Sequence, residues 1–310
     1  MRVAVTGAYG FSGKYMARRL LGLRHEVITL TNSPTRANPF GESVKAFRYN
    51  FSNPSELEKS LRGVDVLINT YWVRFDKPPH FTFAQAVVNS KILLDAAKRA
   101  GVSRVVHVSI TNPDRRSDLP YFSGKAEVED YLKVTGLSYA ILRPAVLFGK
   151  EDILVNNIAW ALRHLPLFGL YGDGRYRLQP VHVDDLAAAA VARITGRTNE
   201  TIDAIGPETF YYRDMVEMMA REIGSRTLIV AMPPMLAYQG VRLLGWIVRD
   251  VINTRDEVRG LMQERLYVNS PPLGMSKLSD WVRASRRNIG RRYTSELRRR
   301  LDRFGGYHSN

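Results

Sequence analysis

A tyrosine and a lysine one helical turn apart are the residues of this 310-residue chain best suited to acid–base chemistry. In the segment Tyr121-Phe-Ser-Gly-Lys125 the spacing places both side chains on one side of a predicted helix. A phenol has a pKa of about 10 and is a poor base at neutral pH, but an adjacent ammonium favours the phenolate. Tyr121 can therefore act as acid or base toward a substrate hydroxyl, with Lys125 as its helper.

Two hydroxyls follow the apolar run that precedes this helix. Ser109 and Thr111 stand at the end of the predicted strand 104–109, where either can orient a substrate oxygen. Lys125 can also hold the ribose of a nicotinamide cofactor. Because tyrosine and lysine recur in many helices, the surrounding elements must show whether this pair is a site.

A glycine-rich turn near the N-terminus predicts a dinucleotide site. Gly7, Gly10 and Gly13 follow a short strand and open a helix. Gly7 allows the tight turn, Gly10 lets the backbone approach a pyrophosphate, and Gly13 lets the helix pack on the strand. The helix N-terminus then points N–H groups at the phosphates. Tyr9 and Phe11 are further candidate contacts, and the alternative is a tight strand–helix turn that binds nothing.

The type of dinucleotide is indicated by the residues after the second predicted strand. An NAD site usually has an acidic residue about 20 positions past the glycines, and Asn32 stands there instead. Arg36 could pair with a 2′-phosphate, so we expect NADP(H); in the alternative, Asn32 contacts the ribose of NAD(H). Asn50 and Phe51 are expected to hold the adenine edge, and Thr70 is a further candidate cofactor contact.

The elements that must position these residues alternate between apolar runs and helical patterns. Strands are expected at 25–31, 44–49, 64–69, 104–109 and 138–143, and helices at 54–62, 83–100 and 121–134. This alternation predicts an α/β fold, a Rossmann doubly wound parallel sheet. Ligands of such sheets bind at the carboxyl ends of the strands, where the candidate residues lie.

The chain changes character after this region. We expect a dinucleotide-binding domain at 1–149, with 177–205 returning to the sheet, and a smaller, mostly helical C-terminal substrate lobe at 150–176 and 206–282. The apolar segment 235–252 is either an amphipathic membrane-contact helix or a lobe helix closing an apolar pocket.

The net charge of +15 is concentrated at the C-terminus. Residues 283–303 hold nine arginines against two carboxylates, within a basic tail at 283–310. Such a tail would meet an anionic membrane surface or an acidic protein, or lie along the body of the protein as a solvated helix. Aromatic residues are not interleaved with the arginines, so specific nucleic-acid binding is not expected.

Composition excludes several kinds of site. The chain has no cysteine, which rules out disulfides, thiolate nucleophiles and cysteine-type zinc sites. Its six histidines lack metal-ligand spacing, so no metal is expected, and His107 is expected to be a packed core residue. We see no signal peptide and no membrane span, and expect a cytoplasmic protein, with peripheral membrane attachment as the alternative.

Taken together, these segments resemble those of extended or atypical short-chain dehydrogenases/reductases, of the NAD-dependent epimerase/dehydratase type. The segments that carry the resemblance are the glycine turn, 96–102, 107–109, 121–129, 142–149, 180–185 and 206–209. The glycine spacing and 121–129 are most similar to the branch that includes the accessory NADPH-binding subunit of respiratory complex I.

The resemblance implies roles for particular residues. Tyr121 would be the acid/base with Lys125 as its helper, Ser109 or Thr111 the orienting hydroxyl, and Asn89 a supporting residue. Pro144 to Val146 would flank the nicotinamide. Arg175 or Arg177 would meet a substrate phosphate; the alternative is a surface arginine paired with Asp173.

Three departures put a nucleotide-sugar substrate in doubt: no acidic residue follows the second strand, Ser109-Ile-Thr111 replaces consecutive serines, and the stretch from Ser109 to Tyr121 is short. Two functions therefore remain. The first is an NAD(P)-dependent oxidoreductase or epimerase-like enzyme acting on an unidentified small molecule. The second is a non-catalytic NADP(H)-binding protein that serves as a structural or redox-sensing part of a larger assembly.

Overall fold

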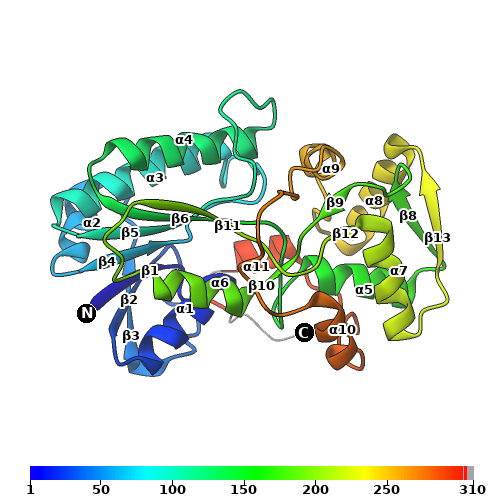
Figure 1. The fold of residues 1–310 in the computed structure, drawn as a ribbon, viewed down its shortest axis with the longest axis horizontal. Coiled ribbons are helices and arrows are strands. Elements are labelled where there is room, and N and C mark those ends of the chain that lie inside the picture. Colours follow the sequence, from blue (N-terminus) through cyan, green and yellow to red (C-terminus); the bar gives the residue numbers. More distant parts are fainter. Residues whose placement is uncertain (303, 306–310) are drawn as a thin grey trace. The chain divides into compact units, whose positions relative to one another are not determined.

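The computed structural model describes residues 1–302 and 304–305, and the chain divides into two compact units (Figure 1). Unit 1 comprises Met1–Pro144 and Val183–Ala204, together with Phe304 and Gly305. Unit 2 comprises Ala145–His182 and Ile205–Asp302.

Unit 1 is built on a seven-stranded sheet in the order β11-β6-β5-β4-β1-β2-β3, in which every pair is parallel. Its strands form from short runs rich in valine, isoleucine and leucine, which suit a sheet buried on both faces. The strands are β1 (Arg2–Thr6), β2 (Glu26–Thr31), β3 (Val44–Arg48), β4 (Val66–Asn69), β5 (Arg104–Val108), β6 (Ser138–Pro144) and β11 (Glu200–Ala204).

Helices cover both faces of this sheet. Figure 1 shows α2 (Pro54–Leu61), α3 (Phe83–Arg99) and α4 (Pro120–Val134) on one face, and α1 (Phe11–Gly22) and α6 (Val183–Ala192) on the other. Side-chain caps fix the starts of two of these helices. Asn53 accepts the backbone N–H of Glu56 at the start of α2, and Thr82 accepts that of Gln85 at the start of α3. The predicted Rossmann doubly wound sheet is confirmed.

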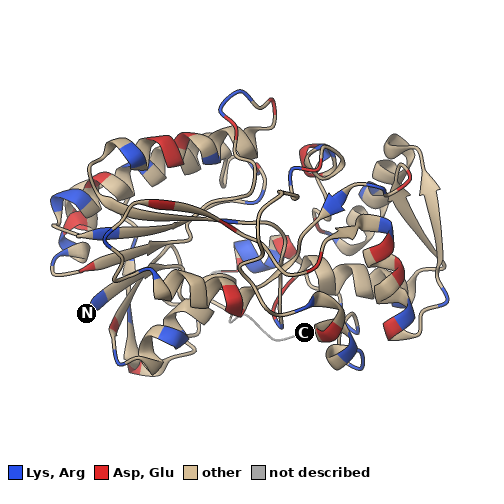
Figure 2. Ribbon diagram, viewed as in Figure 1, with Lys and Arg blue, Asp and Glu red and all other residues tan. Residues whose placement is uncertain are grey.

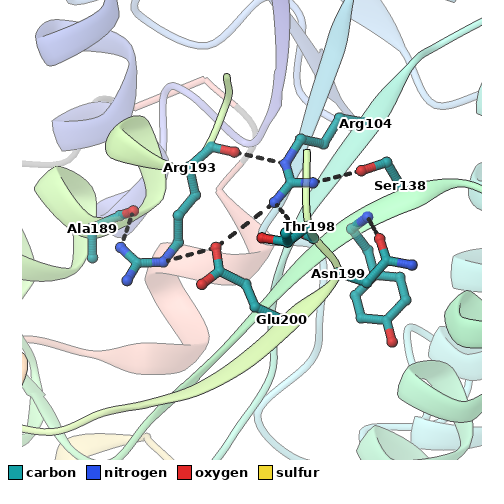
Figure 3. Close-up of polar contacts among 8 residues, drawn as sticks. Arg104, Ser138, Ala189, Arg193, Thr198, Asn199 and Glu200 are labelled. Carbon is teal, nitrogen blue, oxygen red and sulfur yellow. Dashed lines mark hydrogen bonds and ion pairs between the residues drawn. The ribbon is translucent and has the colours of Figure 1, made fainter. Parts of the chain in front are cut away.

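The edge strand β11 is held by a buried arginine at the start of β5 (Figure 3). Arg104 donates from Nε to the carbonyl of Arg193 at 2.7 Å, and from Nη2 to the carbonyl of Thr198 at 3.1 Å. Its Nη1 donates to Ser138 Oγ at 2.5 Å, and Glu200 lies 3.7 Å from Nη2. One side chain thus joins β5, β6 and the connection from α6 to β11.

Unit 2 combines helices with short strand pairs around its own core. Buried Phe148, Leu170, Met215 and Val282 belong to one hydrophobic cluster. The helices are α5 (Leu154–His164), α7 (Tyr212–Ile223), α8 (Pro234–Val248), α9 (Arg255–Met262), α10 (Leu278–Ser285) and α11 (Glu296–Leu301). The strand pairs are β7 (Leu147–Phe148) with β10 (Val181–His182), β9 (Arg177–Leu178) with β12 (Phe210–Tyr211), and β8 (Leu167–Tyr171) with β13 (Leu228–Met232).

The boundaries of the units differ from the expected ones. Residues 177–182, expected in the sheet of the first domain, form β9 and β10 and pair within unit 2. Residues 145–149, expected in the first domain, also belong to unit 2, because β7 pairs with β10 there. Within 177–205, the part that belongs to unit 1 is Val183–Ala204, and it supplies α6 and β11.

The described part of the predicted tail, residues 283–302, is packed into unit 2. A Cβ on Gly290 would lie 2.4 Å from the carbonyl carbon of Ala159, so the chain passes directly against α5. Asn156 accepts the N–H of Gly290 at 2.9 Å and donates to the carbonyl of Arg292 at 3.0 Å. This segment is therefore not a separate extension. Arg303 and residues 306–310 lie outside the described residues.

Some arginines of this segment are bound by the body of unit 2. Arg283 lies 3.2 Å from a carboxylate oxygen of Glu222, and Arg299 donates to the carbonyl of Glu151 at 2.6 Å. Figure 2 shows lysine and arginine distributed over helices of both units, with acidic residues among them. Across the described residues, no helix has the length and apolarity needed to cross a membrane.

Candidate functional site

The glycine turn between β1 and α1 has the close packing that its motif predicts. Gly7 has a φ of +66° and donates its N–H to the carbonyl of Leu30 at 2.8 Å. A Cβ on Gly13 would lie 2.4 Å from the carbonyl oxygen of Gly7, so only glycine allows the helix to approach this closely. Gly10 precedes α1 and offers no side chain to cap it. The first-turn N–H groups of α1 are thus available to an external acceptor.

The two aromatic residues of this turn lie differently. Tyr9 is buried, and its hydroxyl donates to the carbonyl of Val44 at 2.8 Å, while burial raises the pKa of the phenol. The Tyr9 hydroxyl therefore makes its hydrogen bond within the protein. Phe11 begins α1 and meets the ring of Tyr15 edge to face, with centroids 6.2 Å apart.

The loop after β2 holds the two residues expected to choose the dinucleotide. Asn32 is exposed, whereas Arg36 has only 9% of its surface exposed. The N–H of Ala37 donates to the carbonyl of Phe304 at 3.0 Å, so Phe304 lies beside this loop.

An aromatic cluster follows β3 and β4. Asn50 takes a left-handed φ of +46°, and the ring of Phe51 stacks on Tyr49 with centroids 4.8 Å apart. Tyr71 lies 5.1 Å from Phe51, between ring centroids. The amide of Asn89 donates to the Tyr71 hydroxyl at 2.8 Å, which positions the tyrosine from α3. The structure thus brings together four residues that the sequence separates by up to 40 positions.

Hydrogen bonds join the residues at the carboxyl ends of β1 and β4, next to the candidate site. Thr70 donates from Oγ1 to the carbonyl of Thr6 at 2.6 Å, and the N–H of Thr70 donates to Thr6 Oγ1 at 2.6 Å. Asn69 Nδ2 lies 3.2 Å from Nδ1 of His107, which is fully buried as predicted. Burial, and next the charge of Lys125, lower the pKa of His107 well below its ordinary value, so this ring stays neutral.

Lys125 lies inside the protein, with 3% of its surface exposed. Its Nζ donates to the carbonyl of Val108 at 2.9 Å and lies 4.6 Å from the ring centroid of Trp72. Burial lowers the pKa of this amine to about 7, and the nearby carboxylate of Glu129 acts in the opposite direction. Glu129 itself is paired with Arg143, at 3.0 Å between Oε1 and Nε.

Tyr121 lies one turn before Lys125 on α4 and is half-buried. Its ring meets the rings of Trp72 and Phe83 edge to face, with centroids 6.1 and 5.7 Å away. Trp72 therefore touches both members of the predicted acid–base pair. A Cβ on Gly124 would lie 3.2 Å from the Trp72 ring. The absence of a side chain at Gly124 therefore allows the indole to pack closely against α4.

The segment after β5 continues alongside β6 beyond the end of β5. The N–H of Ser109 donates to the carbonyl of Leu142 at 2.7 Å, and the N–H of Thr111 donates to the carbonyl of Pro144 at 3.0 Å. Ser109 and Thr111 are both buried. The two candidate hydroxyls and Pro144 thus lie at the same carboxyl edge of the sheet.

Three buried polar atoms at this edge lack a hydrogen-bond partner within the described part of the chain: Ser109 Oγ, Trp72 Nε1 and His107 Nε2. Buried polar groups without partners are uncommon and call for a ligand, water or ion. Together with the glycine cradle at the start of α1, an unpartnered hydroxyl beside the expected nicotinamide position fits a bound dinucleotide.

Three predicted site residues belong to unit 2. Val146 is buried in the hydrophobic cluster of that unit. Arg175 is exposed, and its backbone N–H, rather than its guanidinium, bonds to Asp173 at 2.9 Å. Arg177 donates from Nε to Glu264 Oε1 at 2.8 Å and from Nη2 to Oε2 at 2.5 Å.

The guanidinium of Arg177 also lies 3.8 Å from the ring centroid of Tyr267. Both the N–H groups and the planar face of the Arg177 guanidinium are thus in contact with residues of unit 2. This differs from the expectation that it meets a substrate phosphate, since a phosphate would have to displace the carboxylate.

Sequence reasoning missed Tyr71 and Trp72. Their signal is their position, since two aromatic residues follow β4 directly at the carboxyl edge, where ligands bind. Among residues 1–302 and 304–305, no group of three or more acidic or histidine side chains could hold a metal ion, and His308 is not described.

Comparison with known proteins adds a family and a fold. The model of the NAD dependent epimerase/dehydratase family matches residues 3–204. The 40 kDa subunit of mitochondrial NADH-ubiquinone oxidoreductase from Neurospora crassa is 27% identical over 238 residues, which are 74% of this chain and 62% of that subunit. The chain therefore spans less than two thirds of that relative's length.

Two solved structures are similar over nearly the whole chain. Triphenylmethane reductase from Citrobacter sp. has a TM-score of 0.76 and 18% identity, covering 93% of this chain and all of that one. It has also been solved with NADP(H). The quinone oxidoreductase QOR2 of Escherichia coli, solved with NADPH, has a TM-score of 0.73 and 19% identity, covering 90% and 98%. At these identities the similarity shows the fold.

Proposed function

Because the chain belongs to the NAD dependent epimerase/dehydratase family, we propose that it is an NADP(H)-dependent oxidoreductase or epimerase-like enzyme whose proton donor is Tyr121. The observation that carries this proposal is the pairing on α4. A half-buried tyrosine stands one turn from a lysine that the protein keeps buried, with a pKa of about 7. Strongly perturbed pKa values of buried groups are concentrated at functional sites.

The side chains have distinct parts in this mechanism. A bound nicotinamide nucleotide supplies or accepts the hydride. Tyr121 donates or takes the proton of the substrate oxygen, and Lys125, when protonated, stabilises the phenolate. Ser109 would orient the same oxygen through its buried, unpartnered Oγ. Trp72, Phe83 and Phe122 make the surroundings of Tyr121 apolar and limit water there.

The preference for NADP(H) is supported by the loop after β2. Its first part, residues 32–40, contains no carboxylate, which would repel a 2′-phosphate, and it contains Arg36. The similar reductases solved with NADP(H) and NADPH support the same choice. Because Arg36 has little exposed surface, its guanidinium would reach a 2′-phosphate only after a local rearrangement of the loop.

The alternative is a non-catalytic dinucleotide-binding protein of a larger assembly. Two observations favour it. The Trp72 ring lies against both Tyr121 and Lys125, and the amine of Lys125 already donates to the carbonyl of Val108. A relative is also a subunit of a multi-subunit oxidoreductase.

Deuteride transfer distinguishes the two functions. The protein is incubated with NADPH carrying deuterium at C4 and a panel of carbonyl and quinone acceptors, and deuterium in the products is measured by mass spectrometry. An enzyme transfers the label, and Tyr121→Phe should lower that rate about 100-fold or more. Nucleotide affinity, followed by nicotinamide fluorescence, should stay within about twofold, because the phenyl ring keeps its packing.

The control is Tyr139→Phe, which removes a hydroxyl from β6. It should leave both rate and affinity unchanged. Transfer that proceeds at the full rate in Tyr121→Phe would contradict the proposed proton donor. Tight NADPH binding with no transfer to any acceptor would favour the non-catalytic function.

A further inference from the structure

Helix α8 of unit 2 presents an apolar face that nothing in the described chain covers. Of its fifteen residues, Ala237 and Gly245 alone are buried. The side chains on its outer face are between 57% and 79% exposed: Met235, Leu236, Leu243, Trp246 and Ile247. A globular protein rarely exposes so many large apolar side chains on one helix unless the face contacts a partner.

The spacing of these residues places them on one face of the helix, on either side of the exposed Gln239. Leu236, Leu243 and Ile247 follow one another at intervals of seven and four, and Met235 and Trp246 are eleven apart, so each set lies on one stripe of a helix. The two stripes are adjacent on the helix. We name this surface the α8 face: Met235, Leu236, Leu243, Trp246 and Ile247.

Two arginines accompany the α8 face: Arg242 lies on α8, and Arg249 is the residue that ends the helix. Arg242 and Arg249 are exposed, and neither forms an ion pair with any carboxylate of the described residues. The nearest acidic residue in sequence, Asp250, is buried and accepts the N–H groups of Glu296 and Leu297, both at 2.9 Å. The only charges offered to solvent along α8 are therefore positive.

We propose that the α8 face is a docking surface for an anionic lipid bilayer, in which α8 lies along the plane of the headgroups. A lipid surface satisfies both features at once. The apolar side chains enter the acyl boundary, the indole of Trp246 lies at the interface, and Arg242 and Arg249 reach the phosphates. Fifteen helical residues span about 22 Å, less than the hydrocarbon core of about 30 Å, so α8 lies on the membrane and does not cross it.

Charge argues against a second copy of the chain as the occupant. In a two-fold symmetric dimer the same face meets itself, which would place Arg242 and Arg249 against a surface that carries no carboxylate. The chain as a whole has a net charge of +15, which opposes self-association and favours an anionic surface.

The test uses the full-length protein and vesicles of phosphatidylcholine with about one-fifth phosphatidylglycerol. Cosedimentation should occur with these vesicles, fall at least about tenfold on vesicles of phosphatidylcholine alone, and weaken as salt rises from about 0.1 M to about 0.5 M. Leu243→Gln should lower the partition coefficient about tenfold. The matched control is Val134→Gln, which removes an exposed apolar side chain of unit 1 and should bind like wild type.

Two further measurements separate the contribution of the Arg242 charge from the depth to which Trp246 enters the bilayer. Arg242→Gln should weaken binding about fivefold, whereas Arg116→Gln, at an arginine that is 95% exposed in unit 1, should not. Brominated lipids should quench tryptophan fluorescence of the wild-type protein, and Trp246→Phe should remove that quenching while binding persists. This second readout does not depend on how the leucine variant folds.

Three results would overturn the proposal: no cosedimentation with anionic vesicles, binding that Leu243→Gln and Arg242→Gln leave unchanged, or bound protein whose Trp246 is not quenched. A dimer in sedimentation equilibrium that Leu243→Gln dissociates would instead assign the α8 face to self-association. None of these results bears on Tyr121, so the enzymatic proposal stands or falls separately.

Discussion

The buried amine of Lys125 should make the stability of the protein depend on pH above neutrality. Its pKa is about 7 in the folded state, against 10.5 for a solvated lysine. Between these values the unfolded chain holds a proton that the folded chain has released. The free energy of unfolding therefore rises with pH from about 7 to about 10, and this residue adds no dependence below about 7.

The size of the effect follows from two opposing influences on the amine. A shift of this size corresponds to about 5 kcal/mol, at about 1.4 kcal/mol for each pKa unit. The face of Trp72, 4.6 Å from Nζ, favours the charged amine by up to about 2 kcal/mol. The loss of hydration on burial outweighs this attraction and leaves the pKa at about 7, and the part of the titration between pH 7 and pH 10 then corresponds to about 3 kcal/mol of pH-dependent stability.

The assay is urea unfolding of the wild type and Lys125→Met from about pH 6 to about pH 10. Lys125→Met removes the titration and keeps a long apolar stem. The wild type should gain about 3 kcal/mol relative to the variant between pH 7 and pH 10. The absolute offset is not predicted, because the variant also leaves the carbonyl of Val108 without its donor.

Lys59→Met is the control, since the Lys59 side chain is 58% exposed on α2 and solvent reaches it in both states. The corresponding difference for that variant should stay flat. If the difference between wild type and Lys125→Met were equally flat, the amine would be charged in the folded protein, and the reasoning about its burial would be refuted.

Three further changes test the packing that supports the site. Gly13→Ala should abolish NADPH binding and lower the free energy of unfolding by about 2 kcal/mol, because its Cβ would lie 2.4 Å from the carbonyl oxygen of Gly7. Gly22→Ala on the same helix is the control, since a Cβ there meets nothing within 4 Å, and it should be neutral or stabilising. Unfolding and nucleotide titration of the two variants measure both effects. Arg104→Met should cost about 3 kcal/mol, since the carbonyls of Arg193 and Thr198 and the hydroxyl of Ser138 lose their donor, and an unchanged denaturation midpoint would contradict this. Asp250→Ala should cost about 2 kcal/mol and speed hydrogen exchange at the start of α11; unaltered exchange there would show that the carboxylate does not hold that helix.

The sequence predicted those parts of the fold that depend on neighbours along the chain. The glycine turn is such a case, because Gly7 and Gly13 are six residues apart and their spacing reports one local packing contact. The strands were found because each is a short buried run rich in β-branched residues, and the pair of Tyr121 and Lys125 was found because one helical turn separates them.

Contacts between distant segments could not be predicted in this way. The burial of Lys125 depends on Trp72, which stands 53 positions earlier and reaches α4 only when the sheet has formed. Arg177 reads as a solvent-facing arginine until Glu264, 87 positions later, lies against it. The arginine-rich segment reads as a tail because composition reports charge, whereas Gly290 and Asn156, which fix it to α5, carry none.

The way in which β11 joins the sheet has a consequence for the synthesis of the protein. Residues 1–144 supply six strands that can pair in turn as they leave the ribosome, but β11 and the contacts of Arg104 need residues 193–204. Residues 145–182 emerge in between, and they belong to unit 2, whose described remainder extends to Asp302. Unit 1 therefore stays incomplete while residues 145–182 of unit 2 are made, and unit 2 stays incomplete while residues 183–204 complete the sheet of unit 1. Until β11 arrives, the edge of β6 remains unpaired and is open to wrong strand partners, so this is the interval in which a chaperone would be of most use.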